Sequence, residues 1–260
     1  MSAGAALELS LRRDRTFVLA GLIAISTLSW AYLFYDERHM GCMAAMSAAA
    51  PRLQPWAASD GVLMFAMWAI MMVAMMVPSV SPMVLTFAMV NRKRREQERP
   101  FVPTAVFLLG YLAVWTVFSA LATAAQWKLH AAALLSPAMV VTSPLLGAGL
   151  LLAAGLFQLT PLKRACLVHC RTPLSFLMAE WREGKWGAFV MGLRHGGYCV
   201  GCCWFLMALL FVAGVMNLLW VALLSGLVLA EKIVPRGRAL SLAAGVALTA
   251  LGLLRLSGLV

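Results

Sequence analysis

The chain has 260 residues, of which 63% are hydrophobic and only 12% charged, and its formal net charge is +11. The charged residues cluster between long apolar runs, which is typical of a polytopic helical membrane protein and excludes a soluble domain. Lys and Arg lie at the ends of the apolar runs rather than on one basic face, so they indicate membrane topology and not a nucleic-acid partner. We predict a single all-α domain over residues 1–260, a transmembrane helical bundle embedded in the lipid bilayer.

Apolar segments long enough for membrane helices recur along the whole chain. They cover residues 16–35, 61–90, 101–125, 143–160, 186–215, 216–230 and 239–256. The count is about seven, with six or eight also compatible with the pattern. The first segment follows three arginines, but its apolar core is long and no small-residue cleavage site follows it, which predicts an uncleaved helix.

The distribution of Lys and Arg over the short connections predicts the orientation. The connections 91–99, 163–185 and 231–238 are basic, whereas 36–60 and 126–142 are not. Seven spans with a cytoplasmic N-terminus place every basic connection inside, as the positive-inside rule requires. We therefore expect an integral protein of the bacterial cytoplasmic (inner) membrane, with connection 36–60 on the external side.

The sequence HGGYCVGCC at residues 195–203 concentrates metal-ligand side chains in one apolar segment. His195, Cys199, Cys202 and Cys203 stand at i, i+4, i+7 and i+8, so on a helix they project from one stripe. Soft sulfur and imidazole donors suit Cu(I) or Zn(II). At 1.5 Å per residue, His195 lies about 13 Å inside the membrane, near the level of Met71 on segment 61–90. The alternative is that Cys and the neighbouring Gly residues serve tight helix packing.

Segment 61–90 carries a methionine stripe. Met64, Met67, Met71 and Met75 fall within about 80° of one another on a helix, and Met72 and Met76 adjoin them. M-x-x-x-M pairs of this kind resemble the thioether filter of the high-affinity copper transporters. The alternative is that methionine is a flexible apolar filler. Pro78 and Pro82 should kink or end the helix, and the carbonyls that they free need partners.

Two further groups of soft donors flank these segments. The external connection 36–60 begins HMGCMAAM and offers His39, Met40, Cys42, Met43 and Met46, either as a copper capture segment or as a flexible loop with chance methionines. On the cytoplasmic side, Cys166, His169 and Cys170 share a face if their stretch is helical, and they are able to hold one metal with a fourth ligand from elsewhere. The alternative there is a membrane-surface helix whose basic residues meet lipid headgroups.

Four longer motifs carry a family resemblance: residues 71–83 (MMVAMMVPSVSPM), 155–176, 191–220 and 229–235 (LAEKIVP). Through them the chain is similar to the domain of unknown function 2182 family, described as predicted metal-binding integral membrane proteins. The resemblance covers most of residues 61–235. It implies a seven-helix-type membrane domain with metal affinity, and it does not imply an activity.

Three functions fit these observations. The first is Cu(I) binding, relay or transport, from residues 39–46 through the methionine stripe to the 195–203 cluster and the 166–170 group, with zinc as the other possible metal. The second is a membrane thiol-disulfide oxidoreductase that uses Cys199 and Cys202. The third is a structural or assembly subunit with a bound metal, joined to another membrane protein or to a second copy. Thioethers are poor zinc ligands and take no part in thiol exchange, so the pattern favours copper and a protein that is not an enzyme.

Overall fold

The computed structural model describes residues 3–47, 58–96, 102–136 and 139–258, and within these ranges side chains are described except for 3–14, 39–47, 58, 95 and 96. Helices dominate this part of the chain, as predicted, and its only β-type pairing is an isolated bridge between Leu135 and Val141. The helices are α1 (Ala3–Ser47), α2 (Ala58–Glu96), α3 (Thr104–Ala131), α4 (Pro144–Leu159), α5 (Pro161–Arg171), α6 (Pro173–Glu180), α7 (Gly184–Ala208), α8 (Leu210–Ala213), α9 (Leu218–Ile233) and α10 (Gly237–Leu256).

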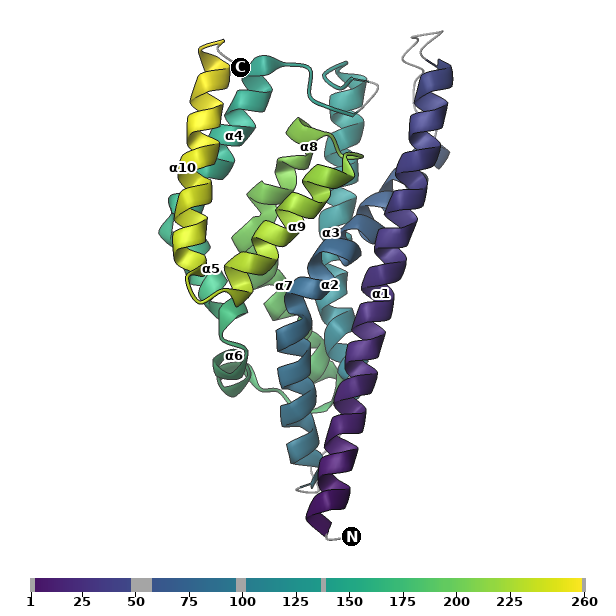
Figure 1. Ribbon diagram of the computed structural model, residues 1–260, viewed down its shortest axis with the longest axis vertical. Helices are drawn as coiled ribbons and strands as arrows, with labels where there is room; N and C mark the ends of the chain where they lie inside the picture. Colours follow the sequence, from purple (N-terminus) through teal and green to yellow (C-terminus); the bar gives the residue numbers. More distant parts are fainter. Residues whose placement is uncertain (1–2, 48–57, 97–101, 137–138, 259–260) are drawn as a thin grey trace.

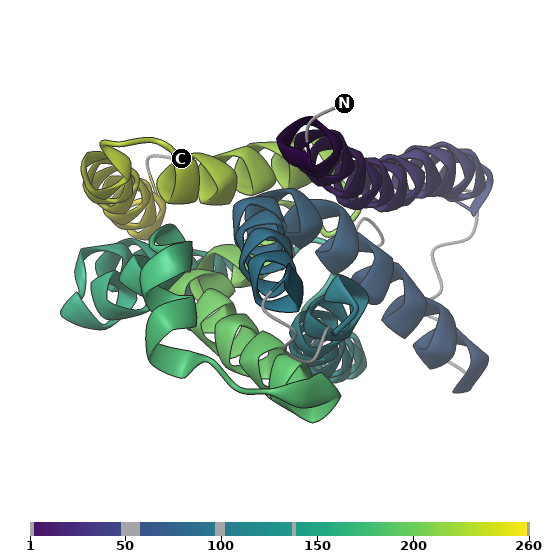
Figure 2. The same cartoon turned by 90° about the horizontal axis from the view of Figure 1, so that it is seen from below.

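The helices form a bundle in which neighbours along the chain are often not neighbours in space (Figure 1). Helix α3 packs along α7, α2 packs against α1 and α3, and α4 pairs with α10 at the other side of the bundle. The view from below shows α1 lying on the outer face of α2 (Figure 2). Short α5 crosses α7, and α9 contacts α2 and α5, so these four helices surround the centre of the bundle.

Several helices meet the requirements of membrane spans. Five segments of the described chain are long and apolar enough, namely residues 15–38, 59–94, 104–131, 184–213 and 237–256. Helices α4 and α5 add a sixth if they form one broken span, because they meet at an angle of 65°. Segment 216–230 corresponds to α9, which has only 16 residues. Membrane-type helices are therefore present, and the count of seven and the cytoplasmic N-terminus stay predictions.

The connections between spans are shorter than predicted, because helices extend into them. Helix α1 continues to Ser47 and α2 begins at Ala58, so much of the expected loop 36–60 is helical. Residues 36–47 contain Ala, Met and Glu and no Pro, which suits helix extension. Helix α2 likewise continues through Glu96 into the 91–99 connection. The connection 163–185 contains most of α5 and all of α6.

Helix α2 passes through both prolines without ending. Figures 1 and 2 show that it changes direction along its length. Pro78 has no N–H for the Ala74 carbonyl, and that oxygen accepts instead from the indole N–H of Trp30 on α1, at 3.2 Å. The Pro78 carbonyl, which Pro82 leaves free, accepts from the Ser81 hydroxyl at 2.8 Å. The predicted need for substitute partners is thus confirmed, and one partner comes from a neighbouring helix.

Glycines bring α3 and α7 into backbone contact. A Cβ added to Gly192 would lie 2.1 Å from the Phe107 carbonyl oxygen, and one added to Gly110 would lie 2.2 Å from that of Phe189. Helix α7 is continuous through its glycines, so close approach rather than local unwinding explains Gly192 and Gly196. Gly197 is different, because a Cβ there would meet nothing within 4 Å. This tight α3/α7 pair fixes the position of the central cysteines.

Candidate metal centre

Cys199 is the hub of the buried polar centre. Its side chain is fully buried on α7. Its sulfur lies 3.1 Å from the Tyr111 hydroxyl of α3 and 3.0 Å from the Lys232 ammonium of α9. Three helices that are far apart in the sequence thus place polar groups around one thiol.

Further thiols surround Cys199. The Cys202 and Cys203 thiols donate to the Cys199 carbonyl oxygen at 3.1 and 3.0 Å, as expected for residues one helical turn later. The Cys170 thiol on α5 lies near the thiols of Cys199 and Cys202 on α7. These four residues, Cys170, Cys199, Cys202 and Cys203, are called the thiol cluster below. All four are buried and free of disulfide bonds.

The geometry joins two groups that the sequence left separate. Cys170 belongs to the 166–170 group, and it completes the cluster started by the cysteines of α7. Cys166 lies at the edge, where a Cβ added to Gly201 would meet its sulfur at 2.9 Å. His169 stacks on the Tyr198 ring with centroids 4.1 Å apart, and its Nδ1 lies 2.9 Å from the Ala165 carbonyl oxygen. Residues 166–170 are helical and face α7, as their spacing predicts.

Lys232 was not predicted from the sequence, yet it is the most informative charged residue of the centre. It is buried, and besides Cys199 it donates to the Ser79 hydroxyl of α2 at 2.9 Å. The adjacent Glu231 cannot balance it, because that carboxylate binds the Lys163 ammonium at 2.7 and 2.9 Å. A buried ammonium needs a counter-charge, and the Cys199 sulfur is the group in position to supply it. The sequence signal was available: a lysine at the end of an apolar segment.

His195 lies one turn before Cys199 in an aromatic enclosure. Its ring centroid is 5.3 Å from that of Phe176, 5.9 Å from Tyr111 and 6.2 Å from Phe107. The side chain is buried, and its Nδ1 has no hydrogen-bond partner among the described residues. Arg194, predicted to need a polar interior, instead forms an ion pair with Glu180 at the end of α6. His195 therefore keeps an unused donor or acceptor beside the thiol cluster, and Arg194 does not belong to it.

The methionine stripe is buried from end to end. Met64, Met67, Met71, Met72, Met75 and Met76 are each at most 9% exposed. Its inner end meets the centre, because the Met76 carbonyl accepts from the Tyr111 hydroxyl at 3.4 Å and the Ser79 hydroxyl lies 3.9 Å from the Met76 sulfur. The level of Cys199 on α2 is therefore Met76 to Ser79. Cys199 and not His195 is thus the α7 residue linked to this part of α2, which differs from the predicted alignment of His195 with Met71.

The outer part of the stripe opens on a small cavity between α1, α2 and α9. Met67 and Met71 line it together with Asp36, Glu37 and Met216. Carboxylates thus stand beside thioethers where α1 leaves its apolar segment. His39, Cys42 and the methionines at 40, 43 and 46 follow on the same helix, and their side chains lie outside the described part of the structure.

The thiols do not form a finished metal site. Within the described residues, no group of three or more His, Cys, Asp or Glu side chains is arranged to hold a metal ion. Cys202 and Cys203 donate to the helix backbone instead of converging on one point. The donor set still has the chemistry that soft metals prefer, with several buried thiols beside thioethers. Side-chain rotation of Cys202 or Cys203 would be needed for joint coordination with Cys199.

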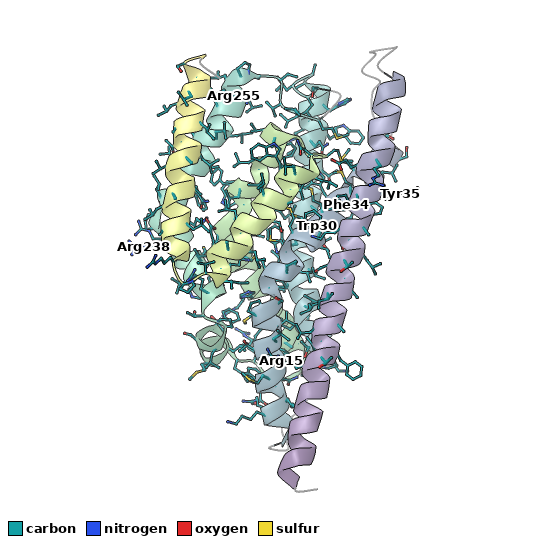
Figure 3. All side chains as sticks on the ribbon, viewed as in Figure 1. Arg15, Trp30, Phe34, Tyr35, Arg238 and Arg255 are labelled. Carbon is teal, nitrogen blue, oxygen red and sulfur yellow. The ribbon has the colours of Figure 1, made fainter. Side chains whose placement is uncertain are left out.

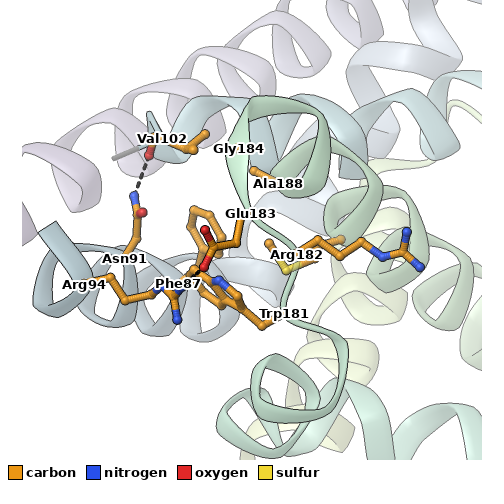
Figure 4. Close-up of a pocket in the computed structure, with 10 residues that line it drawn as sticks. Phe87, Asn91, Arg94, Val102, Trp181, Arg182, Glu183, Gly184 and Ala188 are labelled. Carbon is orange, nitrogen blue, oxygen red and sulfur yellow. Dashed lines mark hydrogen bonds and ion pairs between the residues drawn. The ribbon is translucent and has the colours of Figure 1, made fainter. Parts of the chain in front are cut away.

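A second cavity, far from the cysteines along α7, serves structure rather than metal chemistry (Figure 4). Here the Asn91 amide donates to the Val102 carbonyl, and Arg94 forms an ion pair with Glu183. The Arg94 guanidinium also lies over the Trp181 ring, 4.7 Å from its centroid. These contacts tie the end of α2 to the start of α7 and contain no soft donors apart from Met191.

Comparison with known proteins identifies a family for this chain. Residues 65–255 match the family PpoB2, described as a copper chaperone. This range contains all four motifs of the resemblance noted above, but the matching family is not the domain of unknown function 2182 family. No curated protein and no solved structure matches the chain significantly.

Proposed function

Because the chain belongs to the PpoB2 family of copper chaperones, we propose that it is an integral membrane protein that binds Cu(I) at the thiol cluster and passes it on. The observation that carries the proposal is the meeting of Cys170 with Cys199 and Cys202 across two helices. Cu(I) prefers thiolate and thioether ligands, and both kinds are gathered at this point. Copper is here the cargo, so binding must be reversible.

We propose Cys170, Cys199 and Cys202 as the principal ligands. Cys203 and His195 lie next to them and are proposed as additional ligands. The Lys232 ammonium, 3.0 Å from the Cys199 sulfur, stabilises negative charge on that sulfur, which is the form that binds metal. Arrival of Cu(I) replaces this contact with a metal bond, and Lys232 then partly balances the charge of the thiolates around the metal. The Ser79 hydroxyl and the Tyr111 hydroxyl keep both groups in position.

The two ends of the cluster suggest a path. On one side the cavity of Asp36, Glu37, Met67, Met71 and Met216 would receive the cation, and Met72, Met75 and Met76 lead from there toward Ser79 and Cys199. On the other side Cys166 and the partly exposed His169 lie between the cluster and the surface of α5. Thioethers bind Cu(I) weakly, so they allow it to move on, and they discriminate against zinc.

The oxidoreductase hypothesis is less well supported. Cys199 and Cys202 are at most 1% exposed, so a partner's disulfide could not reach them without opening of α5 or α7. A dithiol catalyst also has no use for the buried methionines beside it. Copper exchange with soluble chelators separates the assembly-subunit hypothesis from the chaperone hypothesis. Copper that such chelators never remove would favour a structural role.

We further propose seven spans with the N-terminus in the cytoplasm of a bacterial inner membrane, and a possible second copy or membrane enzyme as the recipient of copper. The Lys and Arg asymmetry of the connections supports this orientation. A membrane-impermeant thiol reagent should label Cys42 from outside, and a cysteine introduced at Lys93 should react only after the membrane is permeabilised. Labelling of Cys42 only from the cytoplasmic side would reject the proposed orientation.

The test of copper binding compares cysteine variants of the full-length protein purified in detergent under reducing conditions. Joint replacement C170S/C199S/C202S should remove most bound copper, measured by elemental analysis and by the sulfur coordination in X-ray absorption spectra. The single variant C42S serves as the matched control and should keep the copper of the cluster. Wild-type protein without copper, or a triple variant with undiminished copper and intact fold, would contradict the proposal.

A further inference from the structure

A third cavity, polar and distinct from the copper path, lies where α4 and α5 meet α10. Its volume is about 310 Å³. Four cationic side chains line it: Lys163, Arg164, Arg171 and Arg238. The polar groups of Gln158 and Ser241 and the apolar side chains of Leu167, Val168, Pro235 and Leu242 complete the lining.

Among the residues that the structure describes, no acidic side chain lines this cavity. The carboxylate beneath it, Glu231, is already occupied by Lys163, Gln158 and the Ser241 hydroxyl, with the last two at 3.1 and 2.9 Å. Glu231 can therefore offset one of the four cations, and the cavity keeps an excess of positive charge. Like charges gathered in one concave site attract a mobile anion.

The arginines hold their positions while keeping donors free. Arg171 donates to the carbonyls of Glu231, Val234 and Pro235, which fixes its guanidinium at the end of α9. Arg164 makes one hydrogen bond, to the Leu159 carbonyl at 3.2 Å. A guanidinium has five N–H groups, so both side chains retain donors for an anion. The second residue of α10 is Arg238, and the positive end of that helix dipole faces the same region.

We propose that this cavity binds a phosphate group. Tetrahedral phosphate oxygens match several arginine forks at once, and a cavity of this size holds a phosphate with a few further atoms. The apolar wall and the location at the basic connection between α9 and α10 fit the headgroup of an anionic phospholipid with the start of its acyl chains. Free phosphate offers the same chemistry without the apolar part, so the experiment must separate the two sources.

The test uses full-length protein and two arginine variants of α10. Arg238 and Arg255 lie at opposite ends of this helix (Figure 3), and only Arg238 lines the cavity. R238A is therefore the test variant and R255A its matched control. In native mass spectrometry, wild-type protein and R255A should retain phosphatidylglycerol in preference to phosphatidylcholine, with about tenfold weaker retention in R238A.

A second arm adds inorganic phosphate to the protein in phosphatidylcholine nanodiscs. Stabilisation by phosphate that is lost in R238A, without selective lipid retention, identifies free phosphate as the ligand and supports the site. Equal lipid retention in wild type, R238A and R255A, together with no phosphate effect, overturns it. Copper content should be the same in all three proteins, so this outcome does not depend on the proposed copper function.

Discussion

Two buried lysines in this protein have opposite surroundings. Lys163 meets both oxygens of Glu231, at 2.7 and 2.9 Å, and Gln158 and Ser241 complete the network. Lys232, the residue next to Glu231, has no carboxylate partner in the described part of the chain and instead donates to a hydroxyl and a sulfur. The Lys163 ammonium has only oxygen partners, including a carboxylate. The Lys232 ammonium instead contacts the Cys199 sulfur, which a metal can bind.

The difference separates a structural contact from a functional one. A buried ion pair with complete hydrogen bonding holds helices together and leaves nothing for a ligand to gain. The Lys163 network joins α4, α5, α9 and α10 in this way. An ammonium whose counter-charge is a thiolate loses that partner when a metal binds the sulfur, and this exchange suits a copper carrier. Mutations at the two lysines and their partners should therefore affect different measurements.

The largest loss of stability is expected from E231Q. It removes the charge that matches Lys163 and leaves a buried ammonium with neutral partners, at a cost of about 3–5 kcal/mol. Thermal unfolding in detergent, followed by circular dichroism, measures the loss. The double variant K163M/E231L removes both charges and should recover most of the stability. Equal destabilisation by the single and the double variant would show that the ion pair is not the cause.

Copper affinity, rather than stability, should respond most to K232Q. The substitution keeps an unbranched side chain of similar length and adds no sulfur, but it removes the charge that stabilises a Cys199 thiolate, so copper binding should weaken about tenfold, or ~1.4 kcal/mol. Competition with a Cu(I) chelator measures the change, and K232R, which keeps the charge, should retain most of the affinity. If K232Q binds copper as tightly as wild type, Lys232 belongs with Lys163 as a structural residue.

The sequence predicts the membrane-type helices and which cysteines share a helix face, because both depend on local composition and spacing. Cys166 and Cys170 on α5 are four residues apart, and so are Cys199 and Cys203 on α7. This spacing places each pair on one face of its helix. Their meeting could not be predicted, since it depends on the 65° bend between α4 and α5 that turns α5 across α7. The sequence alone contains no signal for that angle beyond the Pro161 that begins α5.

Tyr111, Ser79 and Lys232 illustrate the second limit of sequence reasoning. Each lies in a mainly apolar helix, where an isolated polar or charged side chain has many explanations. Their common meaning appears only in the folded chain, where Tyr111 and Lys232 contact Cys199 and Ser79 contacts Lys232. The predicted alignment of His195 with Met71 assumed straight helices, whereas α2 extends beyond its apolar segment and changes direction along its length.

Replacement of the methionine stripe should separate transport from packing. The variant M67L/M71L/M75L keeps side-chain volume, so we expect less than about 1.5 kcal/mol of destabilisation per site. Copper accumulation or tolerance in cells should nevertheless fall, because Leu offers no sulfur to Cu(I). M89L on the same helix is the matched control, since Met89 is exposed and lies outside the stripe. Unchanged copper phenotypes, together with a Cys199 and Cys202 pair that cycles to a disulfide with respiratory state, would instead support the oxidoreductase.

The smallest effect is expected at the ion pair of Arg94 and Glu183, which extends the comparison of the two lysines to the surface. The Glu183 side chain is 55% exposed and that of Arg94 21%, so water already solvates the carboxylate. Loss of the charge in E183Q should cost only about 0–1 kcal/mol, because exposed pairs gain little over their hydration. The Arg94 guanidinium also keeps its position over the Trp181 ring.

Thermal unfolding of E183Q, measured in parallel with E231Q, tests this expectation, and added salt should reduce the difference in stability between E183Q and wild type. If E183Q destabilises the protein as strongly as E231Q, burial does not decide the value of these ion pairs, and the distinction between the Lys163 network and the Lys232 site loses its physical basis.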